Sequence, residues 1–179
     1  RTGISVPLER GTLVGRTVRF DRISVALAAS GNHAIVRCTV DFDGDYVRST
    51  SSDRTRTSSL GSEQIPLIRD GTTWLLHQGA VPRLGRIVSA LESRRRQFES
   101  DRFDPTDGGT MVQLAETDIS DLHYESLAWY IRSERDEVTV SEDYRLRGNT
   151  PKKPIDRKGT KRLTLKDSEN QFRFVSTPL

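Results

Sequence analysis

A single acidic side chain stands out in this sequence as a candidate for acid–base chemistry. Glu142 takes an inward position between Val140 and Tyr144, in a segment where apolar and polar residues alternate. A carboxylate in a partly apolar cavity has a raised pKa and can act as a general acid or base, with Tyr144 as hydrogen-bond donor. The alternative, which the sequence favours, is a carboxylate that is solvated or paired with Arg162 or Arg173.

Aromatic side chains on the same inward side are candidates for lining a ligand cavity. With Glu142 the set comprises Tyr124, Trp129, Tyr144, Phe172 and Phe174. Ligand cavities are few per protein, and inward aromatic residues of a small sheet more often belong to the core. The core interpretation is therefore favoured. The alternative is a site for a small apolar ligand, with Tyr124 as a second candidate donor.

The remaining reactive residue types do not converge on one place. Cys38 takes an inward position in an earlier alternating segment, where we expect a small buried hydrophobic residue rather than a nucleophile. His33 lies beside an expected turn, and His77 and His123 take outward positions. No pair of histidines has the spacing of a helical metal site, so we expect neither a metal ion nor a cofactor.

Two basic segments are candidates for binding anions. Residues 47–57 and 149–158 are expected to form loops at equivalent ends of two hairpins. Their candidate side chains are Arg48, Arg54, Arg56, Lys152, Lys153, Arg157 and Lys158. Together they could bind phosphate or an anionic glycan, with nucleic acid less favoured. The alternative is that these charged hairpin tips are simply solvated.

The composition is that of a folded globular protein. Of the 179 residues 34% are apolar and 30% are charged, which excludes the collagen-like, disordered and disulfide-rich classes. One cysteine cannot form an internal disulfide, and no apolar run approaches the ~20 residues of a membrane helix. The net charge of +3 is too small to indicate a nucleic-acid partner. The chain starts at Arg1 and has one methionine, Met111, so we expect it to be cut from a longer protein.

Alternation predicts that most of the chain is antiparallel β-structure. From Ala34 to Phe42 every second residue is apolar, which is typical of a strand with one face on the core and one in solvent. The apolar positions change parity at Asp21-Arg22 and again at Glu125-Ser126, where we expect β-bulges.

Helical spacing occurs between the two β-rich parts. It predicts an amphipathic helix from Val81 to about Arg102, with Pro82 tolerated at its start. A break over residues 104–109 follows, and a shorter helix is expected over Met111–Glu116.

The apolar pattern occurs twice, and we interpret this as an internal repeat. The first occurrence consists of Val18, Phe20, Ile23, Val25 and Leu27. The second, 104 residues later, consists of Leu122, Tyr124, Leu127, Trp129 and Ile131. Two closing hairpins, 65–76 and 163–174, match at an offset of 98 residues.

This order of elements resembles the nuclear transport factor 2-like superfamily, also called the SnoaL-like or cystatin-like cone. The resemblance lies in the helix over 86–100, the segment 112–120, the strand pair 129–144 and the closing hairpins. It implies an α+β fold in which N-terminal helices pack on the concave face of a strongly bent antiparallel sheet, here in two tandem copies.

The copies would be residues 1–80, mainly a four-strand β-part, and residues 81–179, a complete helix-helix-four-strand domain. The apolar side of the first sheet would then need another cover, from the second part of the chain or from a partner.

Three functions remain open from the sequence. We favour a non-catalytic accessory or protein-interaction module of a larger bacterial cell-envelope or secreted protein, with a partner or a second copy bound through sheet faces. The first alternative is a small-molecule-binding or isomerase/cyclase-like enzyme that uses Glu142. The second is a binder of anionic polymer that uses the two basic segments.

Overall fold

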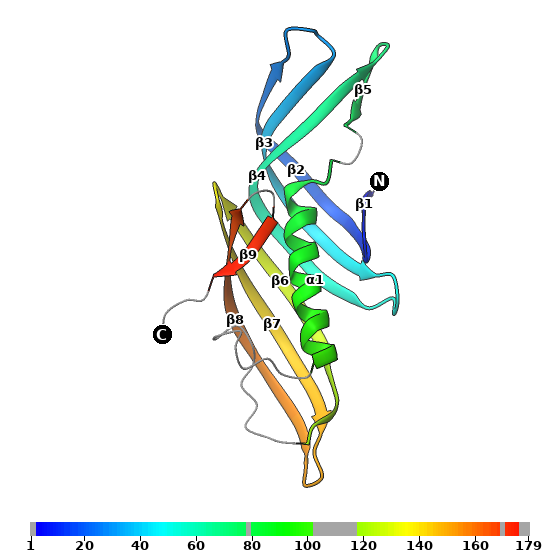
Figure 1. Ribbon diagram of the computed structural model, residues 1–179, viewed down its shortest axis with the longest axis vertical. Helices are drawn as coiled ribbons and strands as arrows, with labels where there is room; N and C mark the ends of the chain where they lie inside the picture. The colour runs from blue at the N-terminus through cyan, green and yellow to red at the C-terminus, as the bar shows by residue number, and fades with distance from the viewer. Residues whose placement is uncertain (1–2, 78–79, 102–117, 169–170, 176–179) are drawn as a thin grey trace.

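The computed structural model describes residues 3–77, 80–101, 118–168 and 171–175. In these residues nine strands form one mixed sheet, and a single helix lies across one face of it (Figure 1). The elements are β1 (Ile4–Leu8), β2 (Gly11–Leu27), β3 (His33–Arg48), β4 (Arg54–Asp70), β5 (Thr73–Leu76), α1 (Arg83–Asp101), β6 (Ser120–Glu134), β7 (Glu137–Asn149), β8 (Pro154–Ser168) and β9 (Gln171–Val175).

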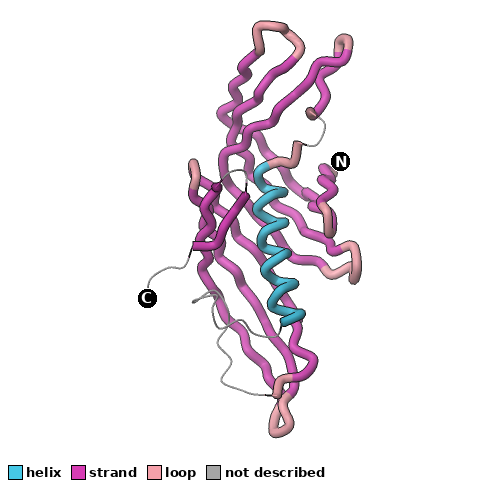
Figure 2. The backbone as a smooth tube through the Cα atoms, viewed as in Figure 1, coloured by secondary structure: helices cyan, strands magenta, loops and turns pink. Residues whose placement is uncertain are grey.

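One parallel pairing joins the two β-rich parts of the chain. The strand order is β1-β2-β3-β4-β6-β7-β8-β9, and β5 pairs with the last residues of β4. Neighbouring strands are antiparallel except β4 and β6, where Arg56–Gly61 runs parallel to Ala128–Ser133. The strands before and after residue 80 therefore form one continuous sheet (Figure 2).

The expected fold class, two tandem α+β cones with N-terminal helices on concave faces, is wrong. Most of the described residues belong to strands of one sheet, and they contain one helix. The closing hairpins also differ. Trp74 on β5 is 38% exposed, whereas the ring of Phe172 on β9 lies 5.6 and 5.2 Å from the guanidinium carbons of Arg83 and Arg86. Matching apolar spacing determines how two strands alternate, but the elements that pack on them are decided elsewhere in the chain. The division at residue 80 stays a prediction.

The predicted strand features are confirmed. Within β3 the inward Cys38 is buried and the outward Arg37 is exposed. The register between β2 and β3 shifts between Asp21 and Ser24, and the register between β6 and β7 shifts just before Ser126. Both bulges thus lie where the apolar positions change parity.

The predicted first helix is present as α1, and a distant strand determines where it begins. Glu63 on β4 accepts hydrogen bonds from the backbone N–H groups of Arg83 at 2.8 Å and Leu84 at 2.7 Å. A carboxylate here satisfies N–H groups that no helical carbonyl can reach, and it complements the helix dipole.

The predicted second helix, Met111–Glu116, lies outside the described residues. In the part of the chain that the structure describes, no helix is long and apolar enough to cross a membrane.

The core lies between α1 and the middle of the sheet. The helix contributes Ile87, Val88, Leu91 and Phe98. The sheet contributes Leu13, Phe42, Tyr46, Leu122, Tyr124, Leu127, Trp129, Ile131, Val138, Val140, Leu146, Leu163 and Leu165.

Beyond the N-terminus of α1 the sheet continues as a four-stranded extension that we call the wing. It comprises residues 16–27 of β2, 33–41 of β3, 62–70 of β4 and all of β5, in the order β2-β3-β4-β5. Figure 1 shows the wing projecting past the start of the helix.

Candidate functional site

Glu142 lies beneath α1 in the inward register that the sequence predicts. It is 3% exposed and is paired with Trp129 across β6 and β7. The indole Nε1 of Trp129 donates to Oε2 at 3.0 Å, and Nη1 of Arg94 lies 3.2 Å from each carboxylate oxygen. The helix thus supplies the ion-pair partner, whereas Arg162 and Arg173 are exposed.

This arrangement immobilises the Glu142 carboxylate. Both oxygens already accept hydrogen bonds, so a substrate would have to displace the Arg94 guanidinium. The ring of Tyr124 lies 5.5 Å from that of Phe98, and burial, together with the negative charge of Glu142, raises the pKa of the Tyr124 hydroxyl. Tyr144, at the next inward position, is half-buried. An acid–base role for Glu142 and Tyr144 stays a prediction.

A second group of charges lies in the same helix–sheet interface. Arg48, at the end of β3, donates from Nε to Glu92 at 2.7 Å and from Nη2 to Glu99 at 2.9 Å. Arg95 also contacts Glu99, at 3.0 Å. Burial raises the pKa of the Glu92 carboxyl, and the positive charges of Arg48 and Arg95 oppose that shift. Ion pairs at Arg48 and Arg94 therefore fix α1 on the sheet.

The first basic segment faces carboxylates instead of forming a free cationic loop. Arg48 is committed to α1, Arg54 lies 3.8 Å from Asp45, and Arg56 lies 3.4 Å from Asp43. The candidate side chains of the second segment are all exposed: Lys152, Lys153, Arg157 and Lys158. Anion binding by the two segments stays a prediction.

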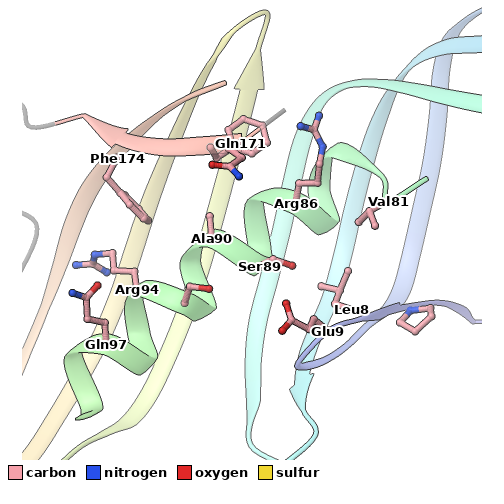
Figure 3. Close-up of a pocket in the computed structure, with 13 residues that line it drawn as sticks. Leu8, Glu9, Val81, Arg86, Ser89, Ala90, Arg94, Gln97, Gln171 and Phe174 are labelled. Carbon is pink, nitrogen blue, oxygen red and sulfur yellow. The ribbon is translucent and has the colours of Figure 1, made fainter. Parts of the chain in front are cut away.

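A groove of about 850 Å³ lies over the outer face of α1, between the end of β1 and β9 (Figure 3). Small helix residues, Ser89, Ala90 and Ser93, form its floor, and β9 contributes Phe172 and Phe174. The lining is mixed in polarity and has no cluster of catalytic residue types, so the groove by itself does not indicate a reaction.

The aromatic candidates divide between this groove and the core. Phe172 and Phe174 line the groove, and their ring centroids lie 5.2 Å from the guanidinium carbon of Arg86 and 5.8 Å from that of Arg94, respectively. Trp129 is fully buried in the core. The sequence placed these side chains on one side of the sheet, and the helix separates them.

The strongest candidate for a functional surface is the side of the wing that α1 leaves uncovered. Alternation along four strands places apolar residues on the side of the sheet where Glu63 contacts the helix, and nine of them are exposed or half-buried and do not pack against the core. We call them the wing face: Phe20, Ile23, Val25, Leu27, Val36, Ile65, Leu67, Trp74 and Leu76. On soluble proteins, large exposed apolar patches usually mark sites of interaction with a protein, a membrane or a ligand.

The same apolar spacing is covered elsewhere in the sheet. Val25 and Leu27 of β2 correspond to Trp129 and Ile131 of β6, 104 residues later. The β2 pair is 59 and 65% exposed, and the β6 pair is 0 and 4% exposed. The difference is α1, which packs over β6. In the described ranges the second half of the chain does not supply the cover expected for the wing face.

The other reactive residues do not add a site. Burial and the nearby charge of Glu63 raise the pKa of the Cys38 thiol. The rings of His33 and His77 lie 6.2 Å apart. Among the described residues, no three metal-binding side chains come together.

Sequence reasoning missed the charged helix–sheet interface, although one signal for it was present. Ile87, Leu91, Arg94 and Phe98 follow one another at spacings of four, three and four residues, which places all four on one face of a helix. Arg94 could thus have been placed beneath the helix, opposite an inward acidic residue.

Comparisons with known proteins add little to this description. No family model matches the chain, and no curated protein matches it. One solved structure with a likeness is described as an Ntf2 like protein involved in plasmid conjugation. It is 11% identical, and the match covers 93% of this chain and 77% of that one with a TM-score of 0.29. At so low a TM-score the likeness supports no conclusion about function.

Proposed function

We propose that this chain is a non-catalytic interaction module that binds a protein partner through the wing face. The observation that carries the proposal is the exposure of apolar residues on one side of a four-stranded sheet. Ile23, Val25 and Leu27 are each about 60% exposed, and Trp74 and Leu76 on β5 are 38 and 49% exposed. A sheet with one apolar face is stable when that face packs against another element.

The size of the patch supports the proposal. The six most exposed members are Phe20, Ile23, Val25, Leu27, Trp74 and Leu76. With a complete large apolar side chain contributing roughly 170 Å², they expose on the order of 500 Å², near the upper end for one patch on a monomer. Such patches are more often functional than incidental.

The two alternatives have less support. For an enzyme, Glu142 is the best candidate, and its oxygens are occupied by Arg94 and Trp129. For a binder of anionic polymer, the arginines of the first basic segment face carboxylates of the same sheet. Placement in a bacterial cell envelope stays a prediction.

Site-specific photocrosslinking tests the proposed function. A benzophenone amino acid at Val25 or at Leu27 would lie on the wing face, and at Ser24 it would lie on the opposite face of the same strand. In cells that produce the protein, we expect the Val25 position to give an adduct with one defined protein, mapped by mass spectrometry and re-formed from the two purified proteins. Equal adducts from both positions, or none from Val25 and Leu27, would contradict the proposal.

A further inference from the structure

We propose that the segment bound by the wing face is an amphipathic α-helix of another protein, which lies on the wing as α1 lies on the rest of the sheet. This inference rests on the proposed function and specifies its partner. The chain itself provides a template for this binding mode, because α1 already packs on β6, where the apolar side chains have the same spacing as those of β2.

The template is close in geometry. In both β2 and β6 a bulge precedes the last apolar residues, with register shifts after Asp21 and after Tyr124. On the covered half, Phe98 of α1 packs 5.5 Å from the Tyr124 ring, and Arg94 of α1 reaches the carboxylate that accepts a hydrogen bond from Trp129. The apolar side chains of β6 that pack against α1 thus have counterparts at the same spacing on β2, and no described helix covers those counterparts.

The wing face has the length of a short helix and begins where α1 begins. From Phe20 to Leu27 the strand advances about 23 Å at roughly 3.3 Å per residue. A helix of about 15 residues spans the same length at 1.5 Å per residue. Glu63 marks the N-terminal end of α1, and Ile65 and Leu67 follow it on the same side of β4. An incoming helix would therefore lie beyond the end of α1 without overlapping it (Figure 1).

Other occupants fit less well. A peptide strand would pair with the edge of β2 or β5, and edge pairing leaves the apolar face uncovered. A second copy of this chain, packed face to face, would bring the Arg69 side chains of both copies into one interface, and the wing face offers no acidic side chain to pair with them. A single helix with an apolar stripe at i, i+3, i+4 and i+7 matches a patch of this size.

The charges beside the wing face favour an acidic polar flank on that helix. Alternation puts Arg69 on the same side as Leu67, opposite Trp74 in the register. The neighbouring Asp70 points to the other side by the same alternation. A helix with Glu beside its apolar stripe would thus meet a positive charge rather than a negative one.

The two tryptophans allow a direct test on the full chain. Trp74 lies on the wing face and is 38% exposed, whereas Trp129 is fully buried, so binding at the wing changes the emission of Trp74 alone. The probe is a synthetic peptide of about 16 residues with Leu at i, i+3, i+4 and i+7 and Glu and Gln elsewhere. A scrambled peptide of the same composition has no apolar stripe and is the control.

We expect saturable binding of the striped peptide, with a blue shift of Trp74 emission that Trp74→Phe abolishes and with a gain of helical circular dichroism. Leu27→Asp places a charge in the interface and should weaken binding about tenfold or more. Ala26→Asp, on the opposite face of the same strand, should leave binding within about twofold of the parent. Both positions are exposed, so neither change should alter the melting temperature.

Two outcomes would overturn the inference. Equal binding of the striped and scrambled peptides would show that no helix is recognised. If sedimentation instead shows a dimer that Leu27→Asp dissociates, the occupant is a second copy, and the wing remains an interaction surface. If benzophenone at Val25 also forms no adduct with a partner protein, the proposed function itself is refuted. Failure of the helix inference and failure of the proposed function are therefore distinguishable.

Discussion

Removing the Arg94 guanidinium tests whether buried charge fixes the helix on the sheet. The side chains of Arg94 and Glu142 are 5 and 4% exposed, and the guanidinium contacts both carboxylate oxygens. Arg94→Met leaves the Glu142 carboxylate buried with Trp129 as its one remaining hydrogen-bond donor in the described contacts. Leaving a buried charge without its partner typically destabilises a protein by about 3–5 kcal/mol.

The double variant separates the ion pair from the general effect of substitution. In Arg94→Met/Glu142→Gln no charge remains, and the Gln oxygen can still accept from Trp129 Nε1. We expect this variant to lose about 1–2 kcal/mol, less than Arg94→Met alone, which is the non-additivity of two residues in contact. Arg145→Met is the matched control. Its pair with Asp156, at 2.7 Å, is exposed to solvent, so its loss should shift the unfolding midpoint far less than Arg94→Met does.

Urea denaturation provides the measurement. In a Trp74→Phe background, the emission of Trp129 reports on the environment of the ion pair itself, and far-ultraviolet circular dichroism reports on the sheet. Arg94→Met should lower the urea midpoint, and in a parallel thermal scan it should lower the melting temperature by about 10 °C, at about 2–4 °C per kcal/mol for a chain of this length. If Arg94→Met costs no more than Arg145→Met, or if the effects of Arg94→Met and Glu142→Gln simply add, the ion pair does not hold α1 in place.

Two further predictions follow from single residues. A Cβ at Gly61 would lie 2.6 Å from Ser133 Cβ and 2.7 Å from the Ser133 carbonyl oxygen. Gly61→Ala should therefore push β4 away from β6 and lower the free energy of unfolding in urea by about 1–3 kcal/mol. An unchanged urea midpoint would contradict this prediction. Burial and the charge of Glu92 raise the pKa of Tyr46 from 10.0 to about 12. The folded chain therefore keeps this proton while the unfolded chain loses it, and the stability that Tyr46 contributes is lost as the pH rises from about 10 to about 12. Thermal unfolding across that range should show a smaller decline in Tyr46→Phe, and an equal decline in both proteins would show that Tyr46 is not responsible.

The charged interface also bears on how the wing came to lie uncovered. Glu63 fixes the start of α1 on the sheet, Arg94 fixes its centre, and Arg48 fixes its end through Glu99. With its N-terminus held at Glu63, the helix cannot slide toward the wing without leaving buried charges unpaired. The structure therefore keeps α1 in place and leaves the wing face for another element.

Local patterns in the sequence determined the elements of this protein. Alternation at Ala34–Phe42 specified a half-buried strand, parity changes at Asp21 and Glu125 specified the bulges, and helical spacing from Val81 specified α1. Each of these signals depends on residues a few positions apart, because side chains alternate along a strand and recur every 3.6 residues along a helix. The inward register of Glu142 could be predicted for the same reason.

Tertiary structure alone decided which of these faces would be covered. The parallel pairing of Gly61 with Ser133 merged both β-rich parts into one sheet, and Glu63, twenty residues before α1, fixed where the helix starts. Contacts between residues so far apart leave no period in the sequence. Val25 and Trp129 therefore share one local pattern, and yet Val25 is exposed and Trp129 is buried, because α1, the one helix of the described residues, covers Trp129 and not Val25.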